Sequence, residues 1–245
     1  MLANIVRTRV AGTRAFSTNA ALVERERKYV TQNYAPYPVV FNKGLGVHMW
    51  DVEGKKYLDF MSGYGSVNQG HCHPEVIKVA VDQMHKLTQT SRAFHNENLG
   101  AFGEYICNLT GYDKFMPANG GCEACEGAIK YARRWGYYVK GVEADKASVI
   151  MANNNFWGRS LAASGSSNDP YRYKDFGPYD GGFPLVDYDS LESIEAQLVA
   201  NQNTVAVYLE PIQGEGGIIM PSDGYLAGVK ALCKKYNCLL IADEV

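Results

Sequence analysis

Apolar residues along the chain follow two spacings, one typical of helices and one typical of strands. From Pro74 to Leu87 they recur every three or four positions, which predicts an amphipathic helix opened by the proline. The same spacing predicts three further helices, over residues 123–138, 191–200 and 225–236. Short runs rich in Val, Ile and Leu predict strands at residues 148–152, 183–186, 205–209 and 239–242. This alternation favours an α/β fold whose mostly parallel sheet carries helices on both faces.

The chain before Pro74 has a different pattern. Residues 34–38 contain two prolines and are expected to be extended, since proline disfavours helical geometry in the residue before it. Two apolar runs at residues 47–51 and 56–61 flank a glycine-containing turn and predict a hairpin. We therefore expect an arm and hairpin over residues 24–73, followed by a large α/β domain over residues 74–245. Within that domain, residues 165–182 lack apolar periodicity and are expected to form a surface excursion.

The first 23 residues differ from the rest in charge. They contain three arginines and no acidic residue, and several of their apolar residues could share one helical face. Residues 14–17, Arg-Ala-Phe-Ser, resemble a cleavage site for a mitochondrial matrix protease. This segment is interpreted as a mitochondrial transit peptide, which implies the mitochondrial matrix. The alternative is an uncleaved, frayed terminus on a cytoplasmic protein.

Composition indicates a small-molecule partner. The 245 residues are 46% hydrophobic, and 24 basic residues nearly balance 26 acidic ones, so we expect neither nucleic acid nor an anionic membrane surface as partner. No apolar run approaches the ~18 residues that a membrane-spanning helix needs. The six cysteines are expected to be free, because thiols are normally reduced in a mitochondrial protein.

A glycine-bearing loop at Gly120 and Gly121 leads into the helix predicted from residue 123. Unpaired N–H groups at such a helix start suit a phosphate, although an ordinary turn before a helix has the same pattern. Cys122 and Cys125 form a Cys-x-x-Cys pair without a second pair at ligand spacing, so a redox or zinc role is not favoured. The adjacent His71, Cys72 and His73 are interpreted as backbone-ordering residues rather than metal ligands.

Polar residues follow three of the predicted strands, at the edge where a parallel sheet binds its ligands. Phe156 and Arg159 follow the first and could supply a stacking face and a carboxylate-binding fork, or only a packed corner. Glu210 and Glu215 follow the third strand, where carboxylates can serve function or only cap a turn. Asp243 follows the fourth, and a carboxylate at the exit of a buried strand needs a positive or hydrogen-bonding partner. A protonated ring nitrogen of a cofactor would be such a partner.

This chain lacks the defining motifs of two classes of nucleotide-binding protein. The Ala-Asp-Glu that ends the chain's last strand also occurs in P-loop nucleotidases, but no Gly-x-x-x-x-Gly-Lys-Ser/Thr string is present. A dinucleotide-binding dehydrogenase is disfavoured in the same way, because no Gly-x-Gly-x-x-Gly joins a strand to a helix.

The order and spacing of six strings resemble the class III aminotransferases, pyridoxal-phosphate enzymes of fold type I. These strings occupy residues 50–54, 67–74, 90–94, 155–159, 210–215 and 241–244. The Asn-Phe-Trp-Gly-Arg and Asn-Gln-Gly-His-Cys-His-Pro strings favour the ornithine aminotransferases among them. The resemblance covers nearly all of residues 29–245 and implies the large cofactor domain of that fold, without its C-terminal part.

The resemblance implies a role for five residues around pyridoxal 5'-phosphate. Backbone N–H groups at Gly121 and Cys122 would hold its phosphate, and Phe156 would stack on its ring. Asp243 would keep the ring nitrogen protonated, which makes the ring an electron sink. Glu210 would be a supporting carboxylate behind these contacts.

The resemblance also implies substrates. Tyr34 and Tyr64 look like residues that recognise ornithine, and Arg159 looks like the residue that binds a carboxylate of 2-oxoglutarate. Glu215 matches an acid that pairs with a later arginine when ornithine binds and releases it for the keto acid. The implied reaction moves the δ-amino group of ornithine to 2-oxoglutarate, giving glutamate semialdehyde and glutamate, in a homodimer.

The family's Schiff-base lysine is expected beyond Val245. We therefore expect this chain to be an N-terminal portion that lacks activity by itself. Two alternatives are a catalytically dead short product that acts as a dimerising or regulatory partner, and another class III ω-aminotransferase.

Overall fold

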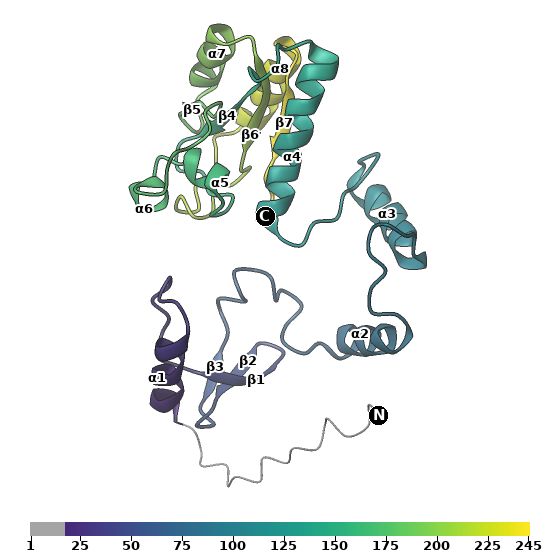
Figure 1. The fold of residues 1–245 in the computed structure, drawn as a ribbon, viewed down its shortest axis with the longest axis vertical. Helices are drawn as coiled ribbons and strands as arrows, with labels where there is room; N and C mark the ends of the chain where they lie inside the picture. The colour runs from purple at the N-terminus through teal and green to yellow at the C-terminus, as the bar shows by residue number, and fades with distance from the viewer. Residues whose placement is uncertain (1–17) are drawn as a thin grey trace. The chain divides into compact units, whose positions relative to one another are not determined.

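A computed structural model of the chain describes residues 18–245 (Figure 1). The described residues form two compact units, which are divided after Gly100. Most of the transit peptide predicted at residues 1–23 lies outside the described residues, and only its last part falls in a described helix. The domain boundary expected between residues 73 and 74 stays a prediction.

The second unit contains a four-stranded parallel sheet in the order β5-β4-β6-β7. Its strands are β4 (Ser148–Ala152), β5 (Leu185–Val186), β6 (Thr204–Leu209) and β7 (Leu239–Ala242). All four were predicted, although β5 is shorter than expected. Every residue of β4 and β6 is buried, which explains why both are continuous apolar runs rather than alternating ones.

Helices cover both faces of this sheet, so the predicted α/β class is confirmed (Figure 1). One face packs against α4 (Gly121–Trp135), and the other against α7 (Leu191–Ala200) and α8 (Tyr225–Lys235). The α4 face includes Ile129, Ala132, Val149, Met151 and Tyr208. The opposite face includes Ile150, Ile194, Leu198, Val207 and Val229. The two faces of a single strand therefore belong to different apolar clusters, as alternation along a strand requires.

The helix predicted over residues 123–138 is divided in two. After Trp135 the chain continues as a π-helix, η1 (Gly136–Lys140), which ends at Gly141 in a left-handed conformation. A Cβ at Gly136 would lie 2.2 Å from Val205 Cγ1, so the chain can pass β6 here only with glycine. The apolar periodicity of residues 123–138 could not predict this contact between Gly136 and Val205, and so it predicted one continuous helix.

The predicted surface excursion contains a short helix that the sequence pattern did not predict, α6 (Pro170–Tyr173). A second unpredicted short helix, α5 (Leu161–Gly165), ends where the excursion begins. Asp169 caps α6 by accepting a hydrogen bond from Tyr171 N at 3.0 Å, and Pro170 occupies the first turn. Most side chains of residues 165–182 are at least partly exposed, as expected. The Arg172 side chain is 23% exposed, because its guanidinium contacts the loops after β4 and β6.

The first unit holds helix α1 (Asn19–Tyr29) and an antiparallel sheet in the order β1-β2-β3. The predicted hairpin is confirmed as β2 (His48–Asp51) and β3 (Lys56–Leu58). A third strand, β1 (Phe41–Leu45), pairs with β2 and was not predicted. Buried Asp51 joins the helix to the sheet, since it accepts hydrogen bonds from Asn19 Nδ2 at 3.1 Å and Tyr57 Oη at 3.0 Å.

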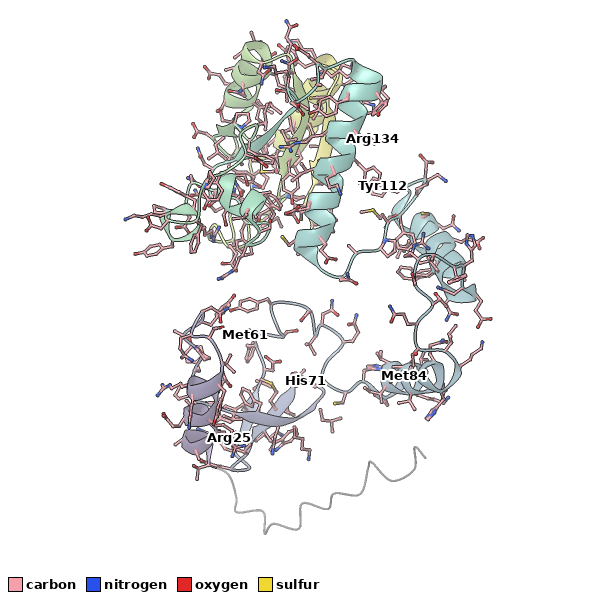
Figure 2. The ribbon with its side chains drawn as sticks, in the orientation of Figure 1. Arg25, Met61, His71, Met84, Tyr112 and Arg134 are labelled. Atoms are coloured by element: carbon pink, nitrogen blue, oxygen red, sulfur yellow. The ribbon has the colours of Figure 1, made fainter. Side chains whose placement is uncertain are left out.

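Two further helices, α2 (Pro74–Lys86) and α3 (Glu97–Thr110), follow the small sheet. α2 begins at Pro74 as predicted, but neither helix buries a residue against the described chain. Figure 2 shows the side chains of α2, with Met84 labelled, and that side chain is 59% exposed. Among the described residues, no helix is long and apolar enough to cross a membrane.

Candidate functional site

Three loops meet at the carboxyl edge of the parallel sheet, where such folds bind ligands. The loop after β4 and the loop after β6 are joined because Phe156 N donates to Glu210 Oε1 at 2.9 Å. Gln213 Nε2 adds a second link between them by donating to Asn153 O at 2.8 Å. The chain leaving β7 remains in register with β6, since Asp243 N donates to Leu209 O at 2.8 Å. The structure thus brings together residues that the sequence placed at three separate strand ends.

Asp243 is the most buried carboxylate of this edge, with 7% of its surface exposed. It accepts a short hydrogen bond from the Tyr208 hydroxyl, one from Cys125 Sγ at 3.6 Å, and one from Val245 N at 3.1 Å. All of these donors within residues 18–245 are neutral. A buried carboxylate held by neutral groups is costly, and a cation beside it would offset the cost.

The donors to Asp243 are held in their protonated forms. Burial raises the pKa of the Cys125 thiol to about 11; the charge of Asp243 acts in the same direction, and the hydrogen bond with Tyr208 acts in the opposite one. Burial and the hydrogen bond to Asp243 also raise the pKa of the Tyr208 hydroxyl. Both side chains therefore remain hydrogen-bond donors at neutral pH and fix the orientation of the carboxylate.

Glu210 joins two loops through its carboxylate. Besides Phe156 N, it accepts a hydrogen bond from Gly214 N at 3.0 Å. Burial raises the pKa of Glu210, and the charge of Asp243 acts in the same direction, whereas the two backbone donors and Arg172 lower it. Both of these hydrogen bonds come from backbone N–H groups, so the carboxylate holds the two loops together.

The glycine loop reaches the same edge through the start of α4. Gly120 is the N-cap residue and provides no side-chain hydrogen bond, so no cap side chain satisfies the first N–H groups of the helix. A Cβ at Gly121 would lie 3.0 Å from Val245 Cγ1. Gly158, at φ +141°, lies so close to Cys122 that its Cβ would be 2.4 Å from the Sγ atom. The loop after β4 therefore packs directly on the proposed phosphate-binding turn.

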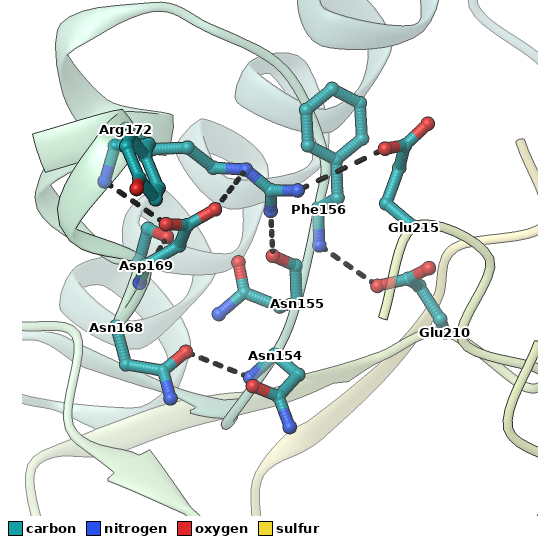
Figure 3. A network of polar contacts seen from close by, with 10 residues as sticks. Asn154, Asn155, Phe156, Asn168, Asp169, Arg172, Glu210 and Glu215 are labelled. Atoms are coloured by element: carbon teal, nitrogen blue, oxygen red, sulfur yellow. Dashed lines mark hydrogen bonds and ion pairs between the residues drawn. The ribbon is translucent and has the colours of Figure 1, made fainter. Parts of the chain in front are cut away.

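Arg172 is a site residue that the sequence pattern missed. Figure 3 shows its guanidinium among the loops, with Nη1 donating to Asn155 O at 2.9 Å and Nε 3.2 Å from Asp169 Oδ2. Its Nη2 lies 3.9 Å from Glu215 Oε2, and its Cζ lies 4.5 Å from the centre of the Phe156 ring. The only sequence signal was local: Asp169 and Pro170 start a helical turn that places an arginine three residues after an acid.

The four residues that were predicted to bind substrate are more exposed than Arg172. Arg159 and Glu215 are exposed residues of the loops after β4 and β6. Tyr34 and Tyr64 belong to the first unit, with exposed fractions of 57% and 79%. Tyr64 stands in a left-handed conformation, φ 56°, within a series of turns.

The cysteines and histidines considered for other chemistry have structural contacts. All six cysteines are free, and Cys125 contacts Asp243. His71 Nε2 lies 2.7 Å from Asp59 Oδ2, and the His71 backbone pairs with Gly46, which orders that turn. In the described part of the chain, no group of three or more His, Cys, Asp and Glu residues is arranged to hold a metal ion.

Comparison with known proteins decides the family. The model of the family described as aminotransferase class-III matches residues 29–245. The chain belongs to the class III aminotransferases. It is 50% identical over 244 residues to the probable mitochondrial ornithine aminotransferase of Caenorhabditis elegans. The aligned region is 100% of this chain and 57% of that protein.

Solved structures of other aminotransferases share the fold. A structure of the ornithine aminotransferase from Toxoplasma gondii matches with a TM-score of 0.90 and 44% identity, over 93% of this chain and 53% of that one. That structure is described as having partial occupancy of PLP at its active site. The acetylornithine aminotransferase of Elizabethkingia anophelis matches with a TM-score of 0.79 and 41% identity, over 93% and 53% of the two chains.

These matches confirm the resemblance drawn from the six strings. They also confirm the fold class, since the aligned structures are ornithine and acetylornithine aminotransferases that match over 93% of this chain. The chain spans about half the length of the relatives that it matches.

Proposed function

We propose that the protein containing this chain transfers the δ-amino group of ornithine to 2-oxoglutarate, with pyridoxal 5'-phosphate as cofactor. The products are glutamate semialdehyde and glutamate. The observation that carries the proposal is Asp243, a buried carboxylate with neutral donors at the carboxyl edge of a class III aminotransferase sheet. Its environment suits a cationic ring nitrogen as partner.

The residues of this edge fit the cofactor at each of its parts. A buried carboxylate matches the ring nitrogen, an uncapped helix start matches the phosphate, and a half-buried aromatic ring matches the pyridine face. When bound, the cofactor supplies an electron sink for negative charge at the substrate carbon.

Asp243 holds the proton on the ring nitrogen. Tyr208 and Cys125 orient the carboxylate for this task by donating hydrogen bonds to it. In this buried position an opposite charge interacts more strongly than in water.

The phosphate is bound by backbone groups. The N–H groups of Gly121 and Cys122 lie at the positive end of α4, so they bind a phosphate without the Cys122 thiol. Phe156 covers one face of the ring and excludes water there, while Glu210 fixes the backbone N–H of Phe156.

The substrate residues are proposed by family resemblance. Tyr34 and Tyr64 recognise ornithine, and the planar guanidinium of Arg159 binds a carboxylate of 2-oxoglutarate. Glu215 pairs with an arginine of the second half of the protein when ornithine occupies the site. The proposed reaction thereby takes first a diamino acid and then a diacid as substrate.

The proposal includes the setting of the enzyme. The protein works as a homodimer in the mitochondrial matrix, and residues 1–23 are its transit peptide. Residues 24–73 form the arm and hairpin, and residues 74–245 belong to the cofactor domain. The mitochondrial name of the Caenorhabditis elegans relative supports this location.

A second candidate is transfer from acetylornithine, which the structural likeness to the Elizabethkingia anophelis enzyme favours. The test is a comparison of donors. The full-length protein, loaded with pyridoxal phosphate and given 2-oxoglutarate, is expected to form glutamate faster from ornithine than from acetylornithine. A preference for acetylornithine would replace the proposed donor, and glutamate formation from neither would overturn the function.

A further inference from the structure

Arg172 contacts four residues of the site, which lie in the loop after β4, at the start of α6 and in the loop after β6. Each of its three guanidinium nitrogens has a different partner. Nη1 donates to Asn155 O at 2.9 Å, Nε lies 3.2 Å from the Asp169 carboxylate, and Nη2 lies 3.9 Å from the Glu215 carboxylate. The face of the same group lies over the Phe156 ring, 4.5 Å from its centre (Figure 3). One side chain thus connects α6 to the loops after β4 and β6.

The planar shape of arginine is needed for this arrangement. A guanidinium can stack on an aromatic face while its N–H groups donate outward in the same plane. A lysine ammonium is a point charge on a flexible stem and cannot both stack and reach three acceptors. The side chain is 23% exposed, so these contacts are only partly screened by water.

The orientation of Phe156 depends on few other polar contacts. Its backbone N–H is held by Glu210 Oε1, and its ring, which carries no polar atom, is half-buried. Arg172 acts at both positions, since it binds the carbonyl of the preceding residue and covers the ring. Removing the guanidinium would free the ring to adopt other rotamers.

We propose that Arg172 is a positioning residue that fixes the Phe156 ring in the orientation in which it stacks on the cofactor. Through Glu215 it also couples that ring to the loop after β6. The inference rests on the proposed function, because it takes the partner of Phe156 to be the pyridine ring.

The test measures binding of 4'-deoxypyridoxine 5'-phosphate to the full-length protein. This probe has the ring and phosphate of the cofactor but no aldehyde, so its affinity reports only non-covalent contacts. Affinity is measured by calorimetry, and orientation by the circular dichroism induced in the probe's absorption band. Arg172→Met is expected to bind the probe about fivefold more weakly, as the loss of one partly buried cation–π contact implies, and to lose most of the induced band.

Matched variants separate this role from general destabilisation. Arg172→Lys keeps the charge and is expected to lie closer to Arg172→Met than to wild type, and it remains informative if Arg172→Met does not fold. The control is Arg134→Met, which removes another cation–π pair: Arg134 lies 4.6 Å from the Tyr138 ring on an exposed surface of α4 (Figure 2). Arg134→Met is expected to bind the probe like wild type.

The outcomes distinguish the two proposals. Wild-type affinity and an unchanged induced band in either folded Arg172 variant would overturn the positioning role. If wild type binds the probe but does not transfer the amino group of ornithine, the proposed reaction fails while the Arg172 variants still test this residue. If wild type does not bind the probe, both proposals are wrong.

Discussion

Replacing Asp243 with asparagine removes a charge while keeping a side chain of the same shape. In the cofactor-free protein, this carboxylate is 7% exposed and all of its described donors are neutral. The charge-assisted hydrogen bonds lost in Asp243→Asn are therefore offset by a smaller desolvation cost. We expect the free energy of unfolding of the cofactor-free protein to change by about 1 kcal/mol or less.

The same substitution should have a large effect when the cofactor is bound and its cationic ring nitrogen lies beside residue 243. Breaking a buried ion pair by neutralising one partner costs about 3–5 kcal/mol, which corresponds to about two to four orders of magnitude in rate or affinity. We therefore expect Asp243→Asn to lower kcat/KM for ornithine by that range, in protein loaded with pyridoxal phosphate.

The assay combines steady-state kinetics with urea unfolding of the cofactor-free and loaded forms. Glu244→Gln is the matched control, because it neutralises the adjacent, exposed carboxylate and is expected to leave both quantities unchanged. The reasoning is refuted if Asp243→Asn keeps wild-type kcat/KM, or if it destabilises the cofactor-free form by several kcal/mol.

Three further predictions concern single residues. Gly158→Ala places a Cβ 2.4 Å from Cys122 Sγ at φ +141°, so affinity for pyridoxal phosphate should fall at least tenfold by fluorescence titration; unchanged affinity would contradict the proposed phosphate turn. Gly136→Ala, 2.2 Å from Val205, should cost about 1–3 kcal/mol in urea unfolding, whereas exposed Gly181→Ala should not. Because burial raises the pKa of Glu210 above its usual value of 4.5, the contribution of this residue to the free energy of unfolding should be present below pH 4.5 and be lost as the pH rises above it. Glu210→Gln should remove this pH dependence, as measured by urea unfolding at several pH values.

The parallel sheet could be predicted from the sequence because its two central strands, β4 and β6, are buried on both faces. Residues 148–152 match β4 at both ends, and residues 205–209 match β6 except at its first residue, since a fully buried strand is a run of apolar residues bounded by polar ones. Residues 239–242 also match β7 at both ends, although this edge strand is only partly buried. The strand β1 could not be predicted, because Phe41–Leu45 has neither alternation nor a continuous apolar run and lies mostly exposed. Its pairing with β2 depends on tertiary contacts that a local pattern does not contain.

The candidate site divides in the same way. Asp243, Glu210 and Phe156 could be predicted because parallel strands end at one edge of a sheet and their following residues must meet there. Arg172 could not, since it enters from an irregular segment, and only the folded chain brings its guanidinium to the Phe156 ring. The π-helix after Trp135 was missed for a related reason: the close approach of Gly136 to Val205 is a contact between distant residues.

The role assigned to Asp243 is tested most directly by the protonation state of the cofactor's ring nitrogen. Full-length protein is loaded with pyridoxal phosphate labelled with ¹⁵N in the ring, and the nitrogen chemical shift is followed by NMR as pH is raised through neutrality. We predict the shift of a protonated pyridinium across this range in wild type, and that of a neutral pyridine in Asp243→Asn. A neutral pyridine shift in the wild-type protein would contradict the assignment of Asp243 as the partner of the ring nitrogen.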